Sequence, residues 1–397
     1  MLMKETLISP WPYYDNEQID ASSKVLRSGR VNFWTGEECK KFEKEFAQWS
    51  GVKHAIAVAN GTLALEASYK SIGLGPGDEF ITTPRTFIAT SSSGVLLGAK
   101  PIFADVDQDS GAITAQNIEK LITSKTKAIS VVHLGGWPAD MPSICELASQ
   151  YQLKVIEDCA QAHGAAIKVK NKFYSVGSFG DISTWSFCQD KIISTAGEGG
   201  MITTKHADTW EGLLAYKDHG KSFKKISQNQ KHTGFRWIHD NIGSNLRLTE
   251  FQSAIGRIQL RKLSTWNKIR RRNALIMANA LKDIPSVRVP MPSKDLKHAW
   301  YKFYAFIKEE NLANGWGREK IMSLINNYGY PIFTGSCSEV YLEKCFKKNN
   351  FYQKNRLPIA KKLGETSLMF LIHPTISEEE MIRYSSCVRD VLNKASN

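Results

Sequence analysis

The segment HAIAVANGTLALEASYKSIG (residues 54–73) joins a strand pattern to a helix pattern through a short polar turn. Residues 54–59 form an apolar run short enough for a buried strand, and the run stops at Asn60-Gly61-Thr62. Residues 63–73 then show the helical spacing of apolar side chains. The segment therefore predicts a strand followed directly by a helix, which is the first half of a βαβ unit.

The same alternation continues along the chain after this segment. Further strands are expected at residues 80–83, 100–105, 127–133 and 154–157, with helices at 87–97 and 142–151. Strands that are separated by single helices pair in parallel, and their helices cover both faces of the sheet. The pattern predicts an α/β fold with a mostly parallel central sheet.

The pattern changes after Asp181. Two strands bracket a glycine-rich loop, a long or broken helix follows, and a strand and two more helices complete the chain; we expect them at residues 182–187, 200–204, 250–281, 300–307, 318–328 and 378–393. Ser377 opens the last helix. We predict a large α/β domain with an N-terminal arm over residues 1–264, and a smaller C-terminal α+β domain over residues 265–397.

The composition is that of a folded globular protein, with 397 residues, 42% of them hydrophobic and 23% charged. It excludes a disordered or collagen-like chain. No stretch approaches the roughly 18 apolar residues of a membrane helix, so we expect no membrane insertion. The first residues lack the apolar segment of a signal peptide, and we expect a cytoplasmic protein.

The net charge is +13, from 52 Lys and Arg against 39 Asp and Glu. A basic balance suits nucleic acid, an anionic membrane or an anionic small substrate, and a solvated surface explains it equally well. The basic residues are spread along the chain, and no helix-turn-helix, zinc-finger or RNA-binding pattern accompanies them. We expect no nucleic-acid partner.

Seven cysteines are scattered along the chain without a C-x-x-C pair. An odd number without paired spacing is typical of neither a disulfide framework nor a zinc ribbon. We expect the thiols to be reduced and mostly buried, and we predict no metal site.

Ligands of a parallel α/β sheet bind at the carboxyl ends of its strands, so polar residues there are the candidate site. Asn60-Gly61-Thr62 opens a helix whose free N–H groups suit a phosphate, although an ordinary helix cap has the same sequence. Glu157 and Asp158 end a buried strand. A carboxylate there is costly unless it meets a cation such as a pyridinium N–H; a metal ligand or a helix cap is the alternative.

Two more sites follow later in the chain. Lys191 comes just after the strand that ends at Ser186 and before a glycine-rich turn. A desolvated lysine can form a Schiff base, whereas an isolated lysine in a loop is usually a surface residue. Asn245 and Arg247 precede Thr249, which is placed to cap the next helix. A phosphate turn, a strand-end acid and a later lysine are together the three anchors of pyridoxal 5′-phosphate (PLP).

Several motifs follow one another in a characteristic order over nearly the whole chain. They include LRSGR (26–30), NGTLAL (60–65), TPRTFIAT (83–90), PADM (138–141), EDCAQAHG (157–164), SF (186–187) with Lys191, GEGG (197–200) and NLRLT (245–249). With these motifs in this order, the chain resembles the DegT/DnrJ/EryC1/StrS family of sugar aminotransferases, members of the fold type I (aspartate aminotransferase) group.

The resemblance implies a role for each matching position. Lys191 would bond to PLP and carry the proton, and Asp158 would keep the pyridine nitrogen protonated. Gln161 would bond the phenolic oxygen, and Phe87 would stack on the ring. The remaining assigned positions would bind the phosphate: Gly61, Thr62 and Ser186 from one subunit, and Asn245 from its neighbour. The last assignment implies a homodimer with shared active sites.

The implied activity is transfer of an amino group from L-glutamate to a keto- or aldehydo-sugar, most often nucleotide-linked, for cell-surface polysaccharide or lipopolysaccharide. An alternative acceptor is an oxidised sugar acid such as 8-oxo-3-deoxy-octulosonate. A PLP-dependent lyase or dehydratase and a non-catalytic regulator with this fold are further alternatives, although the dehydratase branch has histidine where Lys191 stands. Cys188, Trp137 and Ala196 depart from the family pattern, and the first two mark a different substrate pocket.

Overall fold

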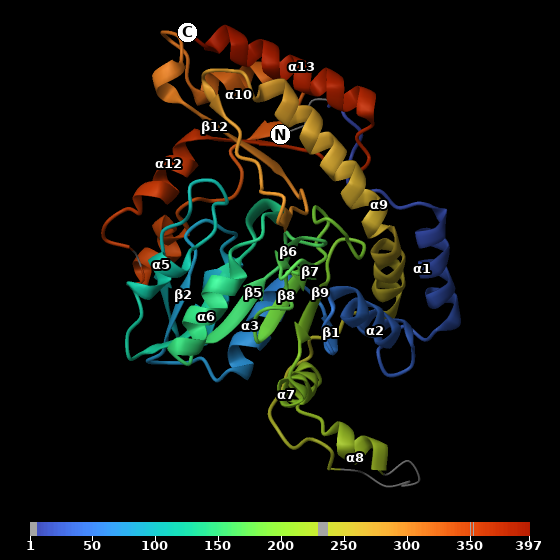
Figure 1. Cartoon of the computed structure of the whole chain (residues 1–397). Helices are drawn as coiled ribbons and strands as arrows, with labels where there is room; N and C mark the ends of the chain where they lie inside the picture. Colours follow the sequence, from blue (N-terminus) through green and yellow to red (C-terminus); the bar gives the residue numbers. More distant parts are fainter. Residues whose placement is uncertain (1–5, 229–236, 350, 352) are drawn as a thin grey trace.

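The computed structural model describes residues 6–228, 237–349, 351 and 353–397 (Figure 1). Residues 1–5, on which part of the signal-peptide expectation rests, lie outside this range. The chain builds a large central sheet with helices around it, and a second, smaller sheet packs with α13 (Glu378–Ala395) and α10 (Arg318–Asn327) above it in the view of Figure 1.

The central sheet has seven strands in the order β1-β9-β8-β5-β4-β2-β3. Their bounds are β1 His54–Val58, β2 Glu79–Thr82, β3 Lys100–Phe103, β4 Thr126–Val132, β5 Lys154–Asp158, β8 Ile182–Ser186 and β9 Gly200–Thr204. Strand β9 runs opposite to the other six strands, because the glycine-rich loop returns the chain directly beside β8. The prediction of a mostly parallel α/β sheet is confirmed.

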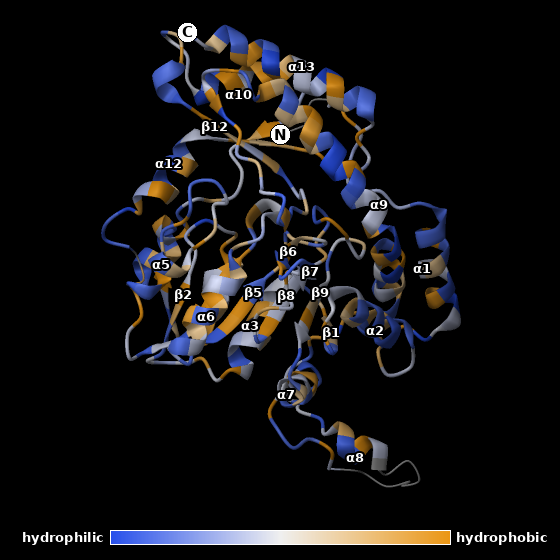
Figure 2. Cartoon of the chain, in the orientation of Figure 1, coloured by the Kyte–Doolittle hydropathy of each residue, from blue (hydrophilic) through white to orange (hydrophobic). Residues whose placement is uncertain are grey.

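Both faces of the sheet are buried, as alternate residues of one strand show. Ala55 and Ala57 of β1 join a cluster with Phe42 and Phe46 of α2 (Glu38–Ser50), while Ile56 and Val58 join a cluster with α3 (Gly61–Ser71). Successive strand side chains point to opposite faces, so a strand buried on both sides reads as a continuous apolar run. Figure 2 shows hydrophobic residues along these strands and mainly hydrophilic ones along α1 (Asn16–Ser28).

The C-terminal part begins on one continuous helix. Helix α9 (Glu250–Leu281) runs unbroken through residue 265, packing on α1 and α2 and then on α13 (Glu378–Ala395). The antiparallel sheet beyond it consists of β10 (Val287–Arg288), β12 (Phe303–Ile307), β14 (Ser367–Phe370) and β13 (Ile332–Phe333).

A separate buried cluster supports this part of the molecule. All of its buried members except Ile8 of the N-terminal arm lie within residues 274–395. The two-domain division at residue 264 stays a prediction, because α9 continues through it and the arm packs on the C-terminal part.

Most expected elements exist, and several were not predicted. Helix α9 is one helix, α10 is Arg318–Asn327, and Ser377 forms a capping box with Glu380 at the start of α13. The following helices and strands were not predicted from the sequence: α1, α2, α5 (Ala115–Glu119), β6 (Ala166–Val169), β7 (Lys172–Ser175), α7 (Ala207–Lys217), α8 (Phe223–Gln228), β10, β11 (Leu296–Lys297), β13, α11 (Lys344–Lys348), α12 (Pro358–Thr366) and β14.

All seven cysteines are free thiols, but the expectation that most are buried is wrong. Cys39 and Cys159 are buried, whereas Cys337 and Cys345 are exposed on loops and on the short helix α11 of the C-terminal part. No helix within the described ranges is both long and apolar enough to cross a membrane.

Candidate active site

A cavity of about 600 Å³ lies at the carboxyl ends of the central strands. Seven of the eight residues singled out from the sequence line it: Gly61, Thr62, Phe87, Asp158, Gln161, Ser186 and Lys191. They come from the ends of β1, β5 and β8 and from the loops that follow β2 and β8. Strands β1, β5 and β8 run in the same direction, so their carboxyl ends lie at one edge of the sheet, which is why residues 130 positions apart meet.

One end of the cavity is the N-terminus of α3. Asn60 is the N-cap, and its Oδ1 accepts from Leu63 N at 2.9 Å, while the N–H groups of Gly61 and Thr62 have no acceptor within the helix. A Cβ on Gly61 would lie 2.8 Å from Cβ of Ser186, so only glycine allows the helix to start against the end of β8. The result is a helix N-terminus beside two hydroxyl groups, which suits a phosphate.

Asp158 is the last residue of β5, and its side chain is buried. Its Oδ2 accepts from the Thr90 hydroxyl at 2.8 Å, and its Oδ1 accepts from Ala160 N at 3.1 Å. Burial raises the pKa of this carboxyl, against the lowering effect of these hydrogen bonds and of Lys191 and His133. A cation at the cavity side would stabilise the charged form.

Glu157 points to the other face of the sheet and has a structural role. Its two oxygens accept from the backbone N–H groups of Gly177, Phe179 and Gly180. His133 Nδ1 accepts from Ala139 N, so its Nε2 carries the proton and donates to Glu157 at 3.1 Å. These contacts satisfy Glu157 without a cation, although His133, Glu157 and Cys159 lie close enough to form a ligand cluster.

Lys191 follows β8 in a tight turn. Its backbone N–H donates to the carbonyl oxygen of Cys188, and its own carbonyl oxygen accepts from Trp11 Nε1 at 2.9 Å. Its side chain is 16% exposed, and its Nζ lies 3.6 Å from Asp190 Oδ1. The same Nζ lies 5.1 Å from the centroid of the Tyr301 ring. Lys191 and Asp158 therefore line one cavity, from two different strand ends.

Lys191, Phe87 and Gln161 also line a second cavity of about 630 Å³, between the central sheet and the C-terminal part. Phe87 is 66% exposed, with its ring free on the cavity side. Gln161 Oε1 accepts from Gly135 N at 2.7 Å, which leaves its Nε2 as a donor. Asp190 lines both cavities as well, so these four residues lie where the two cavities meet.

The second cavity holds polar residues that the sequence analysis missed. Tyr301 donates from its hydroxyl to Asp190, and Lys302 Nζ lies 4.6 Å from the centroid of the Tyr301 ring. Arg270 of α9 lies behind them, and its Nη1 donates to the carbonyls of Trp300 and Tyr301. The signal in the sequence is the lysine inside the aromatic run 300–307, a run that by itself predicts only a strand.

Asn245 lies outside the first cavity. It is exposed, in a bridge with Asp218, next to Arg247, which forms an ion pair with Asp218. Thr249 is the N-cap of α9, but its hydroxyl donates to Gln252 Oε1 and caps no backbone N–H. Thr249 therefore occupies the N-cap position, as expected, but its side chain does not form the capping hydrogen bond.

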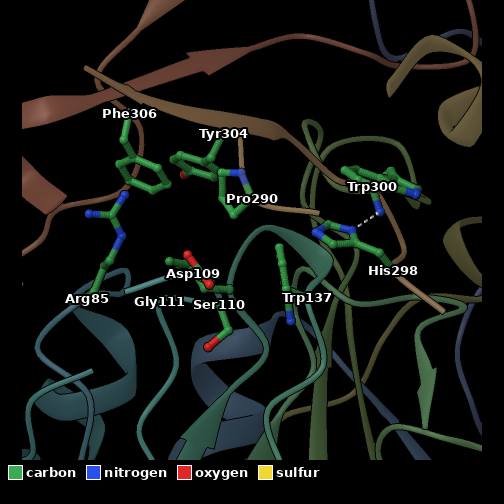
Figure 3. A pocket seen from close by; sticks show the side chains of 11 residues that line it. Arg85, Asp109, Ser110, Gly111, Trp137, Pro290, His298, Trp300, Tyr304 and Phe306 are labelled. Atoms are coloured by element: carbon green, nitrogen blue, oxygen red, sulfur yellow. Dashed lines mark hydrogen bonds between the residues drawn. The ribbon is translucent and has the colours of Figure 1, made fainter. Parts of the chain in front are cut away.

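The departures from the family pattern fall in different places. Cys188 lines the first cavity, and Ala196 has a left-handed φ of 61° in the loop before β9. Trp137 lines a separate pocket of about 20 Å³ between the loops of the large sheet and β12. Figure 3 shows this pocket, with Arg85 pointing toward Phe306 and Tyr304 at one end.

Three comparisons place the chain among known proteins. The pattern of the DegT/DnrJ/EryC1/StrS aminotransferase family matches residues 12–389. UDP-N-acetyl-3-dehydro-alpha-D-glucosamine 3-aminotransferase of Acidithiobacillus ferrooxidans is 35% identical, over 95% of this chain and 94% of its own. GDP-perosamine synthase of Escherichia coli O157:H7 is 36% identical, over 87% and 88%. The crystal structure of an aminotransferase from Psychrobacter cryohalolentis has a TM-score of 0.94 at 48% identity, over 97% and 98% of the chains.

Proposed function

Because the chain belongs to the DegT/DnrJ/EryC1/StrS aminotransferase family and is a PLP-dependent sugar aminotransferase, we propose that it moves an amino group from L-glutamate to a nucleotide-linked keto- or aldehydo-sugar. The product would serve cell-surface polysaccharide, including lipopolysaccharide. The sugar-nucleotide names of two relatives support a nucleotide-linked acceptor.

The observation that carries the proposal is the shared cavity of Lys191 and Asp158. The donor set around that cavity matches the chemistry of PLP. A primary amine can bond to its aldehyde, a buried carboxylate can meet its pyridine nitrogen, and a helix N-terminus with two hydroxyl groups can hold its phosphate. Bound PLP supplies the electron sink and carries the amino group between the two substrates.

We assign the following tasks to the residues of this chain. Asp158 holds a proton on the pyridine nitrogen, since its buried carboxylate is stabilised by the resulting cation. Gln161 donates from Nε2 to the phenolic oxygen, and Phe87 covers the ring. The residues that bind the phosphate are Gly61, Thr62 and Ser186.

Lys191 is the group that moves the proton. Its Nζ would accept the proton that leaves the substrate carbon and hold it for return, so this amine must lie within reach of the bound substrate. Asp190 and Tyr301 are positioning residues for this amine, because the Asp190 carboxylate lies beside it and is itself fixed by the Tyr301 hydroxyl.

The proposal includes a homodimer with shared active sites in the cytoplasm. Asn245 would reach the phosphate of the neighbouring subunit. Its exposed position outside the cavity of its own chain supports that assignment.

A panel assay with L-glutamate as donor tests the proposal. Nucleotide-linked keto-sugars and oxidised sugar acids are supplied as acceptors, and products are identified by mass. We expect one nucleotide-linked sugar to gain an amino group, and we expect the pure protein to absorb visible light from lysine-bound cofactor. Lys191→Ala should lose both properties. Lys53→Ala, which changes an exposed lysine before β1, should keep them. A colourless wild-type protein that aminates no sugar would contradict the proposal.

The second candidate acceptor is an oxidised sugar acid such as 8-oxo-3-deoxy-octulosonate. The observation in its favour is the pair of cations Lys302 and Arg270 near Lys191, which suits a substrate with a carboxylate. The same panel separates the two candidates.

A further inference from the structure

Lys302 is a cation inside the second cavity, and no carboxylate of the described residues lies within ion-pair distance of it. It lies just before β12, lines the cavity beside Lys191, and has its ammonium group over the Tyr301 ring. Within the described ranges it has no ion pair and no side-chain hydrogen bond. A partly buried ammonium group that makes only a cation–π contact remains under-solvated, because three N–H donors need acceptors.

The cations near this cavity outnumber the acids. Lys191, Lys302 and Arg270 are close enough to influence one another, and Asp190 is the carboxylate among them. Arg270 is buried behind the wall of the cavity and does not line it, and its Nε and Nη2 have no hydrogen-bond partner, so it adds positive charge to the site without touching a ligand. Buried charges are normally paired, so this arrangement favours an anionic ligand.

Asp190 is already engaged. Its Oδ2 accepts from the Tyr301 hydroxyl, and its Oδ1 lies 3.6 Å from Lys191 Nζ. Although burial raises the pKa of Asp190, Lys191, the Tyr301 hydroxyl and Lys302 together lower it. The negative charge of Asp190 therefore balances one of these cations, and the positive charge of the others stays unbalanced.

We propose that Lys302 binds a carboxylate of the substrate, on the side of Lys191 that faces the C-terminal part. The inference rests on the proposed function and names the group that the site recognises. The carboxylate belongs either to the glutamate donor or to an acid sugar, since both substrates of a transaminase react in turn at the same site.

The charge balance favours a carboxylate over a phosphate. Once Lys191 is bonded to the cofactor, Lys302 and Arg270 face the single negative charge of Asp190. One monovalent anion neutralises the positive charge that remains, whereas a phosphate dianion would leave an excess of negative charge. The helix N-terminus, which suits a phosphate, lies in the other cavity.

Equilibrium binding of 2-oxoglutarate to the pyridoxal form of the holoenzyme tests the donor source. This compound has two carboxylates and no amine, so it cannot react with that form, and calorimetry gives its dissociation constant. We expect Lys302→Gln to weaken binding by about tenfold to a hundredfold, because a charged hydrogen bond is lost. Lys302→Arg should stay within about threefold of wild type.

Lys308→Gln is the matched control, because it removes the same charge just beyond the other end of β12 and does not line the cavity. The visible spectrum and the melting temperature of each variant establish that it is folded and holds cofactor.

A second arm tests the sugar source. The Michaelis constant of Lys302→Gln is measured for an acid sugar and for its neutral counterpart. If only the acid sugar is affected and 2-oxoglutarate is not, the carboxylate belongs to the sugar and the inference stands.

If a wild-type enzyme that aminates sugars shows no change in either arm on Lys302→Gln, the inference is overturned and the proposed function survives. A wild type that binds no 2-oxoglutarate and aminates nothing would instead overturn the proposed function, and the inference with it.

Discussion

The hydroxyl group of Thr90 donates a hydrogen bond to Oδ2 of Asp158 across 2.8 Å, and joins the start of α4 (Ala89–Leu96) to the end of β5. The hydroxyl of Thr86 lies 2.9 Å from that of Thr90. Because the single proton of Thr90 is used on Asp158, Thr86 must donate to Thr90. Two hydroxyl groups thus orient the carboxylate from the motif that also supplies Phe87.

Thr90→Val should lower kcat/KM by about tenfold, because it removes a hydrogen bond to a charged group while keeping the shape of the side chain. Thr90→Ser should retain most of the activity. Steady-state kinetics with saturating glutamate measure the effect, and the visible spectrum reports cofactor binding. Equal rates for Thr90→Val and wild type would show that Asp158 needs no such orientation.

Asp158→Asn should reduce turnover by about a hundredfold or more. The amide has nearly the same shape, but it cannot supply the negative charge that keeps the pyridine nitrogen protonated. Single-turnover measurements of the glutamate half-reaction separate this effect from product release. Wild-type rates in a variant that binds the cofactor normally would exclude the assigned role.

The binding of 2-oxoglutarate should weaken above about pH 8. Burial lowers the pKa of Lys302 to about 8; Arg270 and Lys191 act in the same direction, and Asp190 opposes them. His373 also lines the cavity, but its pKa of about 3 keeps it neutral throughout this range. Lys302 is charged below pH 8 and loses its proton above it, so the dissociation constant should rise up to tenfold per pH unit.

Lys302→Arg provides the comparison for this pH dependence. A guanidinium group stays charged throughout the range, so the profile of this variant should be flatter between pH 7.5 and 9.5. Calorimetric titrations at several pH values measure both proteins. Parallel profiles would assign the pH dependence to another group.

Arg85→Met should leave the free energy of unfolding unchanged or raise it by about 1 kcal/mol. Arg85 is buried between Tyr304 and Phe306; Nη1 donates to Ser338 Oγ, while Nε and Nη2 have no partner. A methionine keeps the apolar contacts and removes the cost of burying the charge.

Arg85→Ala is the control for this substitution, because it leaves a cavity. It should cost about 2 kcal/mol or more. Denaturant unfolding compares the variants with wild type. A strong destabilisation by Arg85→Met would show that the guanidinium group is paired in the working protein.

Most strands of the central sheet could be predicted because the sequence patterns that specify them are local. The run 54–59 stops at Asn60-Gly61-Thr62, and β1 and α3 follow that pattern closely. Helix α1 was missed although Asp15 and Gly29 cap it, because Gln18 is its one buried residue and the helix has no apolar stripe; α2 was missed although Phe42 and Phe46 have helical spacing. The burial of the cysteines depends on packing between distant segments, and that prediction was wrong for most of them.

The amino-acid sequence alone determined the order of strands and helices and the polar residues at the strand ends. Hydrophobic period and turn chemistry act over a few residues, and parallel pairing then brings Gly61, Asp158 and Lys191 to one edge. Only the tertiary structure decided that Tyr301 and Lys302 stand beside Lys191, and that Asn245 lies away from its own cavity. The contact between Tyr301 and Asp190 joins segments that are more than a hundred residues apart in the sequence. It depends on how the C-terminal part and α9 pack on the central sheet.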